Sequence, residues 1–324
     1  MITKTSVAVL LGLLSAFSPA SAAPPLEPNE LGQIMVLEYH QMGPGEGRWR
    51  RTFEHFRDDL AALYARGYYL TNLNDLIDRH LDVPKGKTPV VLTFDDSAPG
   101  QFNTIRTAAG DEILDPGCAA GIITEFSRRH PDFGRAATFY MMPDAKRGNA
   151  RSKLLRELVA LGFEIGNHTL THPRLDKTSR ERTEHEIAGL QAWVELNVPG
   201  YRIRSMALPF GIYPKWNGVM MDSWAADGKS DGVTYHHEAL LEVGSGPMPS
   251  PFSRKLKLLH IPRIQVWGDA PAGQPVFSYF LHYFDQHPEA RFVSDGEAET
   301  ITVPKARSGE LDGQFTKTHR VILR

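Results

Sequence analysis

The sequence is poor in cysteine: Cys118 is the single cysteine among 324 residues. One thiol cannot close an internal disulfide, which excludes a small scaffold held together by cysteine pairs. We expect Cys118 to be a small buried hydrophobic side chain without a chemical role.

The chain also lacks an excess of charge of either sign. It has 36 Lys and Arg against 38 Asp and Glu, a formal net charge of −2 and a pI of about 6.7. Nothing is basic enough to predict nucleic acid as a partner. The hydrophobic content of 41% and charged content of 23% are ordinary for a globular protein. The length allows one α/β barrel or two smaller domains.

Long hydrophobic runs are missing except at the start of the chain. Lys4 precedes the almost continuously apolar residues 7–17, and Ala20-Ser21-Ala22 supplies small side chains. This run is too short to span a bilayer comfortably, and the pattern is typical of a secretory signal peptide. We therefore predict a signal peptide over residues 1–22 and an exported protein, periplasmic or secreted, with no membrane span after cleavage.

Short apolar runs alternate with amphipathic segments along the rest of the chain, and polar residues recur where the runs end. This alternation favours a parallel α/β arrangement. We expect strands near residues 34–37, 89–92, 136–142, 163–166, 203–208, 232–235 and 256–264. We expect helices between Thr52 and Gly67 and near residues 72–80, 119–129, 152–161, 178–196, 219–226 and 277–285.

Two further segments complete the expected organisation. Residues 97–118 are polar and glycine-rich and are expected to form a long loop. The tail contains two β-like runs, 300–303 and 320–323. Without a clear linker, we predict one catalytic domain over residues 23–290 and a C-terminal extension over 291–324.

Two adjacent carboxylates, Asp95 and Asp96, follow the apolar run 89–92 directly. The carboxyl ends of parallel strands are where α/β sheets and barrels place their chemistry. Adjacent aspartates repel each other, so folding alone gives little reason to place both at the end of a core strand. A metal ion, or a division of labour between a ligand and a base, would supply a reason.

A second group of metal-type ligands lies at His168 and His172. Asn167, Thr169 and Pro173 favour a loop or an irregular turn over a helix at this point. Together with Asp96, the two imidazoles form a usual catalytic zinc set that leaves a position for water. Cobalt, nickel or manganese also suit such ligands.

Other histidines and the tryptophans are weaker candidates. His40 ends a predicted strand, whereas His236, His237 and His260 lack ligand-like neighbours in the sequence. Four of the five tryptophans could stack on sugar faces, but we expect them in the core or at its edge; they are Trp49, Trp216, Trp224 and Trp267.

Three motifs in order resemble the signature motifs of the NodB-type polysaccharide deacetylases, carbohydrate esterase family 4. They are Thr93-Phe94-Asp95-Asp96, His168-Thr-Leu-Thr-His172 and Leu208-Pro209-Phe210-Gly211. Any one motif is weak, but the ordered series is specific and extends over residues 33–270. The resemblance implies a distorted (β/α) barrel, here with a short C-terminal β-like extension.

The resemblance also implies roles for individual residues. The catalytic base falls on Asp95, and the ligands of one divalent metal, zinc by preference, fall on Asp96, His168 and His172. The N–H group that helps to hold the oxyanion falls on Phe210.

The chain departs from the family pattern at several positions. Ser97 stands where glycine is usual, and Ala207 stands where the third motif carries arginine. The late Leu-x-His motif has its nearest counterpart in Leu258-Leu259-His260.

One branch, the exported poly-N-acetylglucosamine deacetylases, has an early Tyr-His and a late Pro-Arg-Ile, as in Tyr39-His40 and Pro262-Arg263-Ile264. That likeness implies that His40 is the general acid and that Arg263 replaces the missing arginine beside Asp95.

These inferences predict metal-dependent hydrolysis of an acetyl group, on nitrogen of an N-acetylglucosamine-type polysaccharide or oligosaccharide. An O-acetyl esterase of the xylan type would use the same residues. Because of the departures at Ser97 and Ala207, a non-catalytic carbohydrate- or metal-binding relative is a further alternative. A metallophosphoesterase is disfavoured, because a single set of three ligands indicates one metal.

Overall fold

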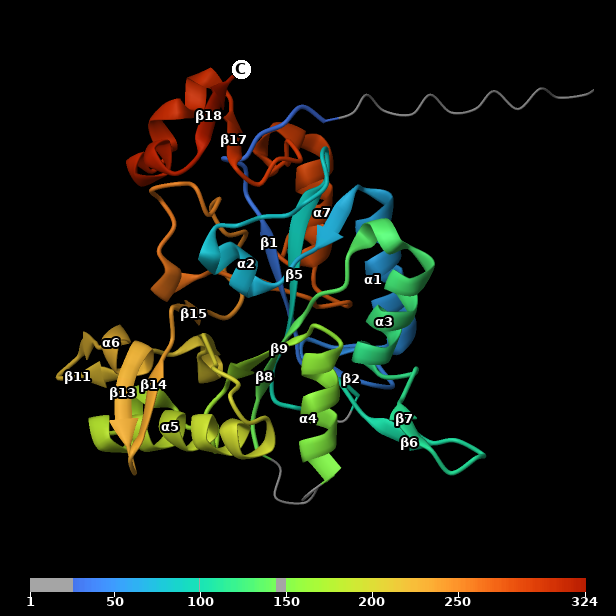
Figure 1. Cartoon of the computed structure of the whole chain (residues 1–324), viewed down its shortest axis with the longest axis vertical. Helices are drawn as coiled ribbons and strands as arrows, with labels where there is room; N and C mark the ends of the chain where they lie inside the picture. Colours follow the sequence, from blue (N-terminus) through green and yellow to red (C-terminus); the bar gives the residue numbers. More distant parts are fainter. Residues whose placement is uncertain (1–25, 99, 144–149) are drawn as a thin grey trace, which may run out of the picture.

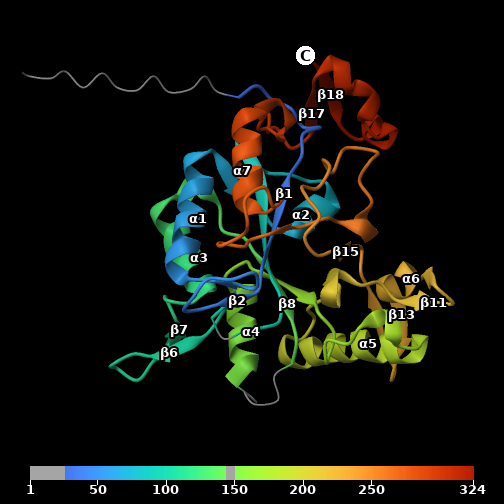
Figure 2. The same ribbon diagram turned by 180° about the vertical axis from the view of Figure 1, so that it is seen from behind.

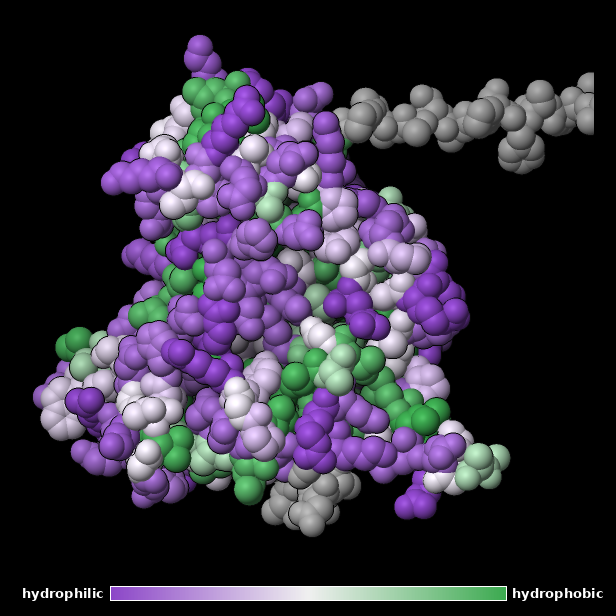
Figure 3. Space-filling model, viewed as in Figure 1, coloured by the Kyte–Doolittle hydropathy of each residue, from purple (hydrophilic) through white to green (hydrophobic). Residues whose placement is uncertain are grey.

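The computed structural model describes residues 26–98, 100–143 and 150–324. The predicted signal peptide, residues 1–22, lies outside the described residues. Within the described part, no helix is both long and apolar enough to cross a membrane. Figure 3 shows polar side chains over most of one face, with apolar residues in separate groups.

A curled parallel sheet forms the centre of the molecule (Figure 1). Neighbouring strands in its main path run in the order β15 (Ala239–Leu241), β10 (Ser205–Ala207), β9 (Glu164–Asn167), β8 (Thr138–Met141), β5 (Thr88–Phe94), β1 (Met35–Tyr39) and β16 (Ile264–Gln265). Every pairing along this path is parallel. The predicted α/β fold with a distorted (β/α) barrel is thereby confirmed.

The two edges of the path approach each other just before β16. Leu241 and Ile261 form a parallel bridge, and the Ile261 N–H donates to the Leu240 carbonyl at 2.9 Å. On the other side, β4 (Tyr68–Leu70) and β8 pair with the same edge of β5, at Thr88–Val90 and at Thr93–Phe94 respectively. The barrel is therefore distorted where β4 and β8 separate.

Helices cover the sheet in two groups. Figures 1 and 2 show α1 (Phe53–Ala65), α3 (Ala119–Arg129) and α7 (Phe277–Gln286) beside β1 and β5, and their apolar faces join these strands in one buried cluster. Helices α4 (Ala150–Ala160) and α5 (Arg180–Asn197) lie on the β8 and β9 side. Thr52 caps α1 as its sequence predicts, because its hydroxyl accepts the His55 N–H at 3.1 Å.

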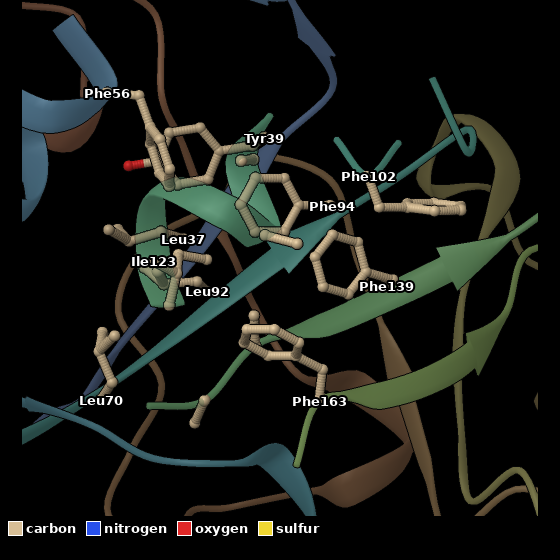
Figure 4. Packing of buried hydrophobic residues seen from close by; sticks show 14 of the residues in the cluster. Leu37, Tyr39, Phe56, Leu70, Leu92, Phe94, Phe102, Ile123, Phe139 and Phe163 are labelled. Carbon is tan, nitrogen blue, oxygen red and sulfur yellow. The ribbon is translucent and has the colours of Figure 1, made fainter. Parts of the chain in front are cut away.

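Aromatic side chains fill the core under the ends of β1, β5 and β8 (Figure 4). The rings of Tyr39 and Phe94 stack with centroids 5.2 Å apart, and Phe94 stacks on Phe139 at 4.9 Å. Phe56 meets Tyr39 edge to face at 5.1 Å. Because Tyr39 and Phe94 directly precede His40 and Asp95, this packing holds the strand ends from which those side chains project.

The C-terminal segment packs at the opposite end of the strands. It contains the parallel pair β17 (Thr300–Val303) and β18 (Arg320–Leu323), as the sequence predicts. Ile301, Val303 and Phe315 are buried in one cluster with residues that precede and begin β1. The boundary predicted at residue 291 stays a prediction.

Three segments differ from the sequence-based expectations. Residues 97–118 contain a hairpin of β6 (Thr104–Arg106) and β7 (Glu112–Leu114) that turns at Gly110, where φ is +89°. Residues 215–220 form a second hairpin, β11 (Lys215–Trp216) and β12 (Val219–Met220), so that helix α6 is shortened to Asp222–Ala226. Asn217 and Gly218 both have positive φ, which is the usual Asn-Gly hairpin turn that the helix prediction overlooked.

The third difference concerns residues 232–264. The run near 232–235 belongs to a separate hairpin of β13 (Asp227–Ser230) and β14 (Val233–His236), and β15 supplies the strand of the sheet instead. Within the strand predicted at 256–264, residues 258–260 form a 3₁₀ turn. From this part of the chain, only β16 pairs with β1. Pro262 lacks the N–H that a continuous strand would need.

Candidate metal centre and acid–base site

The predicted site residues meet at the carboxyl ends of β1, β5 and β9. All of them except the buried Arg263 border a cavity of about 290 Å³. Its lining residues are His40, Gln41, Trp49, Asp95, Asp96, His168, His172, Phe210 and Val243. Trp49 is therefore part of the cavity wall, and both Trp49 and Trp216 are exposed, so neither of these two tryptophans is packed in the core.

Asp96, His168 and His172 converge as a possible metal site. Asp96 Oδ1 lies 3.3 Å from His168 Nε2 and 3.6 Å from His172 Nε2. One ligand atom from each of the three residues lies within 4.8 Å of the others. Two imidazoles and one carboxylate are a usual catalytic zinc set.

The orientation of His168 provides an independent test of that fit. Its Nδ1 lies 2.7 Å from the Ala207 carbonyl oxygen, so Nδ1 carries the proton and Nε2 presents a lone pair. The buried Nε2 has no hydrogen-bond partner among the described residues. A buried nitrogen without a partner is costly, and a divalent cation would satisfy it. The residues present therefore fit a metal.

The loop that carries His172 is held by hydrogen bonds to its backbone. The Thr169 hydroxyl accepts the His172 N–H at 3.0 Å, and the Thr171 N–H and hydroxyl both donate to Glu186, at 2.8 and 2.7 Å. Burial lowers the pKa of His172. His172 is therefore neutral near pH 7, the form that binds metals.

Backbone strain is concentrated around the same cavity. Of the eight non-glycine residues with positive φ in the described chain, five lie here. They are Asp96 (+73°), Ser97 (+55°), Thr169 (+68°), His172 (+56°) and Phe210 (+58°). Such conformations typically cost ~1–3 kcal/mol each and are concentrated at functional sites. The Ser97 hydroxyl accepts the Met142 N–H at 2.8 Å, which ties this turn to the end of β8.

Asp95 lies beside the metal-type residues but has a different partner. Arg263 donates two parallel hydrogen bonds to its carboxylate, Nη1 to Oδ1 and Nη2 to Oδ2, both 2.8 Å. Both side chains are buried. Although burial alone raises the pKa of Asp95, the charge of Arg263 lowers it well below its ordinary value. Asp95 is therefore an ionised carboxylate at neutral pH.

Glu38 is a functional candidate that the sequence reasoning missed. It is buried at the end of β1, where one oxygen accepts the Gly244 N–H at 3.1 Å. Its other oxygen lies 3.7 Å from His40 Nδ1, and His40 Nε2 lies 3.9 Å from Asp95 Oδ2. Burial raises the pKa of Glu38, while Arg263 and His40 oppose the rise. The sequence did contain a signal for Glu38, because it is a charged residue inside the otherwise apolar run 35–39.

Phe210 reaches the cavity through a strained turn after β10. Its ring is exposed and lies 4.4 Å from the ring of His172. Its N–H has no hydrogen-bond partner among the described residues and is free to bind an oxyanion.

Position 207, where arginine is usual, is occupied by Ala207. Its carbonyl oxygen accepts the hydrogen bond from His168 Nδ1–H. The guanidinium beside Asp95 comes from Arg263 instead.

The remaining candidate histidines lie away from the cavity. His237 is buried with Nδ1 2.8 Å from the Ala225 carbonyl oxygen, and burial lowers its pKa to about 4. His236 faces Asp227, and His260 lies between Asp222 and Glu242. These histidines stabilise local structure.

Fold and site together define a class: α/β barrel proteins with an Asp–His–His cluster and a separate buried carboxylate at the carboxyl rim. Comparison with known proteins agrees. Residues 132–218 match the family model described as polysaccharide deacetylase.

The chain is 30% identical over 128 residues to a chitooligosaccharide deacetylase of Sinorhizobium fredii, covering 40% of this chain and 49% of that protein. It is 31% identical over 129 residues to a chitooligosaccharide deacetylase of Rhizobium leguminosarum bv. phaseoli, covering 40% and 47%. The matches thus span about half the length of these relatives.

Two solved structures share the fold. The Streptococcus pyogenes deacetylase PplD in complex with acetate has a TM-score of 0.54 and 18% identity, covering 73% of this chain and 93% of that chain. A de-N-acetylase from Aggregatibacter actinomycetemcomitans has a TM-score of 0.50 and 14% identity, covering 78% and 99%. Residues 132–218 therefore resemble polysaccharide deacetylases in sequence, and the chain shares its fold with the two solved structures.

Proposed function

We propose that this protein is a metal-dependent deacetylase that removes N-acetyl groups from an N-acetylglucosamine-type polysaccharide or oligosaccharide. One observation carries the proposal: an ionised, arginine-held carboxylate lies next to an Asp–His–His cluster in which a buried imidazole nitrogen lacks a partner. The names of the curated relatives support the substrate class. The predicted signal peptide supports export and an extracytoplasmic glycan.

Asp96, His168 and His172 would hold one divalent metal, with zinc as the first choice from the ligand types. Such a metal, when bound, polarises the acetyl carbonyl and lowers the pKa of a bound water. Ala207 and Thr169 orient the ligands from outside, through the His168 Nδ1–H and the His172 N–H.

Asp95 is the general base in this proposal. Its two bonds to Arg263 fix the orientation of the carboxylate and keep it ionised, so that it accepts a proton from the attacking water. A buried carboxylate without the arginine would have a higher pKa. Arg263 is in turn held by the Glu242 carbonyl, which its Nε meets at 2.6 Å.

Phe210 acts on the carbonyl side of the amide C–N bond that breaks, and His40 acts on its nitrogen side. The free Phe210 N–H donates to the developing oxyanion, where removing one such donor typically costs on the order of 10²-fold or more in rate. His40 protonates the departing amine, which an amide requires because an unprotonated amine leaves poorly. Both residues border the same cavity.

The test is acetate release by the metal-loaded protein on a panel of N- and O-acetylated oligosaccharides. We expect release from N-acetylglucosamine oligomers, and we expect Asp95→Asn to abolish it while the metal stays bound. Unchanged release in Asp95→Asn with metal present would remove Asp95 from the role of base. Glycan and metal binding without acetate release from any member of the panel would instead indicate a non-catalytic relative.

A further inference from the structure

Gln41 and Trp49 line one part of the cavity and belong to the segment directly after His40. This segment contains β2 (Gln41–Met42) and β3 (Arg50–Arg51). Arg48 and Arg50, which we call the arginine lip, flank Trp49 in this segment. Phe210 and Val243 line the cavity without charge.

Arg48 is exposed, yet its side chain is held in place. Its guanidinium carbon lies 5.0 Å from the ring centre of Trp49 and 5.5 Å from that of Trp267. Its Nε donates to Gln265 Oε1 at 3.2 Å, and Gln265 is a buried residue of β16. The two terminal nitrogens have no hydrogen-bond partner among the described residues. The rings of Trp49 and Trp267 and the side-chain amide of Gln265 thus fix the guanidinium, while the N–H groups of its two terminal nitrogens stay free.

Arg50 is likewise held by neutral groups. Its Nε and Nη2 donate to Gln41 Oε1 at 3.1 and 2.7 Å, and its Nη1 donates to the Pro44 carbonyl at 3.5 Å. The neighbouring Arg51 differs, because it is paired with Asp59 and Glu46. Within the described chain, neither Arg48 nor Arg50 has a carboxylate within 4.0 Å.

Holding a long charged side chain still costs conformational entropy, and a guanidinium held without an anion gains little in return. A fixed fork of free N–H donors is suited to bidentate binding of a carboxylate or phosphate. Trp49, which carries Arg48 on its ring, also contacts His40 with ring centres 4.6 Å apart. An anion bound at the arginine lip would therefore lie beside the sugar that is being deacetylated.

We propose that the arginine lip is a subsite for an anionic substituent, a carboxylate or a phosphate ester, on the sugar next to the acetylated one. The favoured substrate is then an acidic N-acetylated glycan. This inference rests on the proposed deacetylase function and specifies the substrate class at the same site. Arg48 is the principal contact, and Arg50 adds positive charge.

Three oligosaccharides of equal length test the subsite: a neutral N-acetylglucosamine oligomer, an oligomer alternating with glucuronic acid, and an N-acetylglucosamine oligomer carrying a phosphate monoester. The variants are Arg48→Gln, Arg48→Lys and Arg50→Gln. Arg202→Gln is the matched control, because Arg202 is exposed and precedes β10, at the other end of the strands. Comparison of the two acidic oligomers distinguishes the carboxylate from the phosphate.

We expect the wild-type protein to favour at least one acidic oligomer by about tenfold or more in kcat/KM, with the preference falling as salt is added. Arg48→Gln should lose that preference through KM and leave the neutral oligomer unchanged. Arg48→Lys should keep part of it, and Arg202→Gln should match the wild type. Equal kcat/KM on neutral and acidic oligomers would overturn the subsite while leaving the deacetylase function intact.

A merely structural role for Arg48 predicts a different result. If Arg48 only supports Trp49 against His40, then Arg48→Gln lowers kcat on all three oligomers alike, which would also overturn the subsite. Titration calorimetry of the metal-loaded protein with the same oligomers tests binding separately from turnover. Tighter, Arg48-dependent binding of an acidic oligomer without any acetate release would support the subsite and reject the deacetylase function.

Discussion

Two three-residue clusters of acids and histidines lie side by side at the rim of the barrel. Glu38, His40 and Asp95 form one, and Asp96, His168 and His172 form the other; each brings its ligand-type atoms within 4.8 Å of one another. By ligand type and spacing alone, both would be candidate metal sites. Their surroundings differ.

The difference lies in one arginine. Arg263 binds both oxygens of Asp95 at 2.8 Å, and its Nε lies 3.6 Å from Glu38. The guanidinium of Arg263 therefore supplies the positive charge next to the two carboxylates of the first cluster. The second cluster has no such partner, and the Nε2 of His168 is unsatisfied among the described residues. Two adjacent aspartates can therefore coexist, one paired with arginine and one next to two imidazoles, which is compatible with the proposed division into a base and a metal ligand.

The largest effect is expected from removing that arginine. Arg263→Met leaves Asp95 and Glu38 buried without their partner, which typically costs ~3–5 kcal/mol of unfolding free energy. Chemical denaturation measures the loss. Adding Asp95→Asn should recover part of it, because the buried charge is then removed; further destabilisation in the double variant would contradict this account.

A different substitution at the same position tests the protonation state of Asp95. Because Arg263 lowers the pKa of Asp95, Arg263→Lys, which retains the charge but not the bidentate geometry, should raise that pKa. Asp95 would then gain its proton at a higher pH. The acid limb of the pH–activity profile should move upward, and a profile identical to that of the wild type would count against Asp95 as the base.

The next largest effect is expected in the second cluster. Asp96→Asn and His172→Ala should abolish stoichiometric metal binding, measured by elemental analysis, and reduce acetate release to the level of chelator-treated protein. Loss of an outer contact to a ligand already costs ~10–100-fold in affinity, so loss of a ligand should cost more. His185→Ala, an exposed histidine facing Asp231, is the control and should keep both metal and activity.

His40→Ala should have an intermediate effect that depends on the substrate. General acid catalysis contributes ~10²–10⁴-fold, and an amine leaving group needs it more than an alkoxide does. We therefore expect a decrease of about 100-fold or more on N-acetyl substrates and a smaller one on O-acetyl substrates. Equal losses on both, measured as kcat/KM, would show that His40 is not the acid.

The smallest effect is expected at Ser97. Ser97→Gly relieves a side chain held at φ +55° but removes the hydroxyl that accepts the Met142 N–H. These two changes oppose each other, so the unfolding free energy should move by no more than ~1 kcal/mol. Activity should stay within about twofold; a large loss would mean that the hydroxyl positions Asp96.

Local pattern predicted most of the helices and strands because the apolar periodicity of each segment matches its buried face. The helix at 119–129 and the strands at 300–303 and 320–323 have the bounds expected from sequence. The hairpin at 215–220 was missed because two positive φ values at Asn217 and Gly218 outweigh a helix-like spacing. Such turns depend on backbone conformation at two residues rather than on periodicity.

The sequence by itself determined which side chains stand at the ends of parallel strands, and hence that Asp95, Asp96, His168 and His172 share one rim. Only the tertiary structure decided which of the two carboxylates is paired with an arginine. Arg263 reaches Asp95 across 168 positions of the chain because β16 and β5 both pair with β1. Strand register and side-chain reach set that contact, and neither is encoded in local sequence spacing.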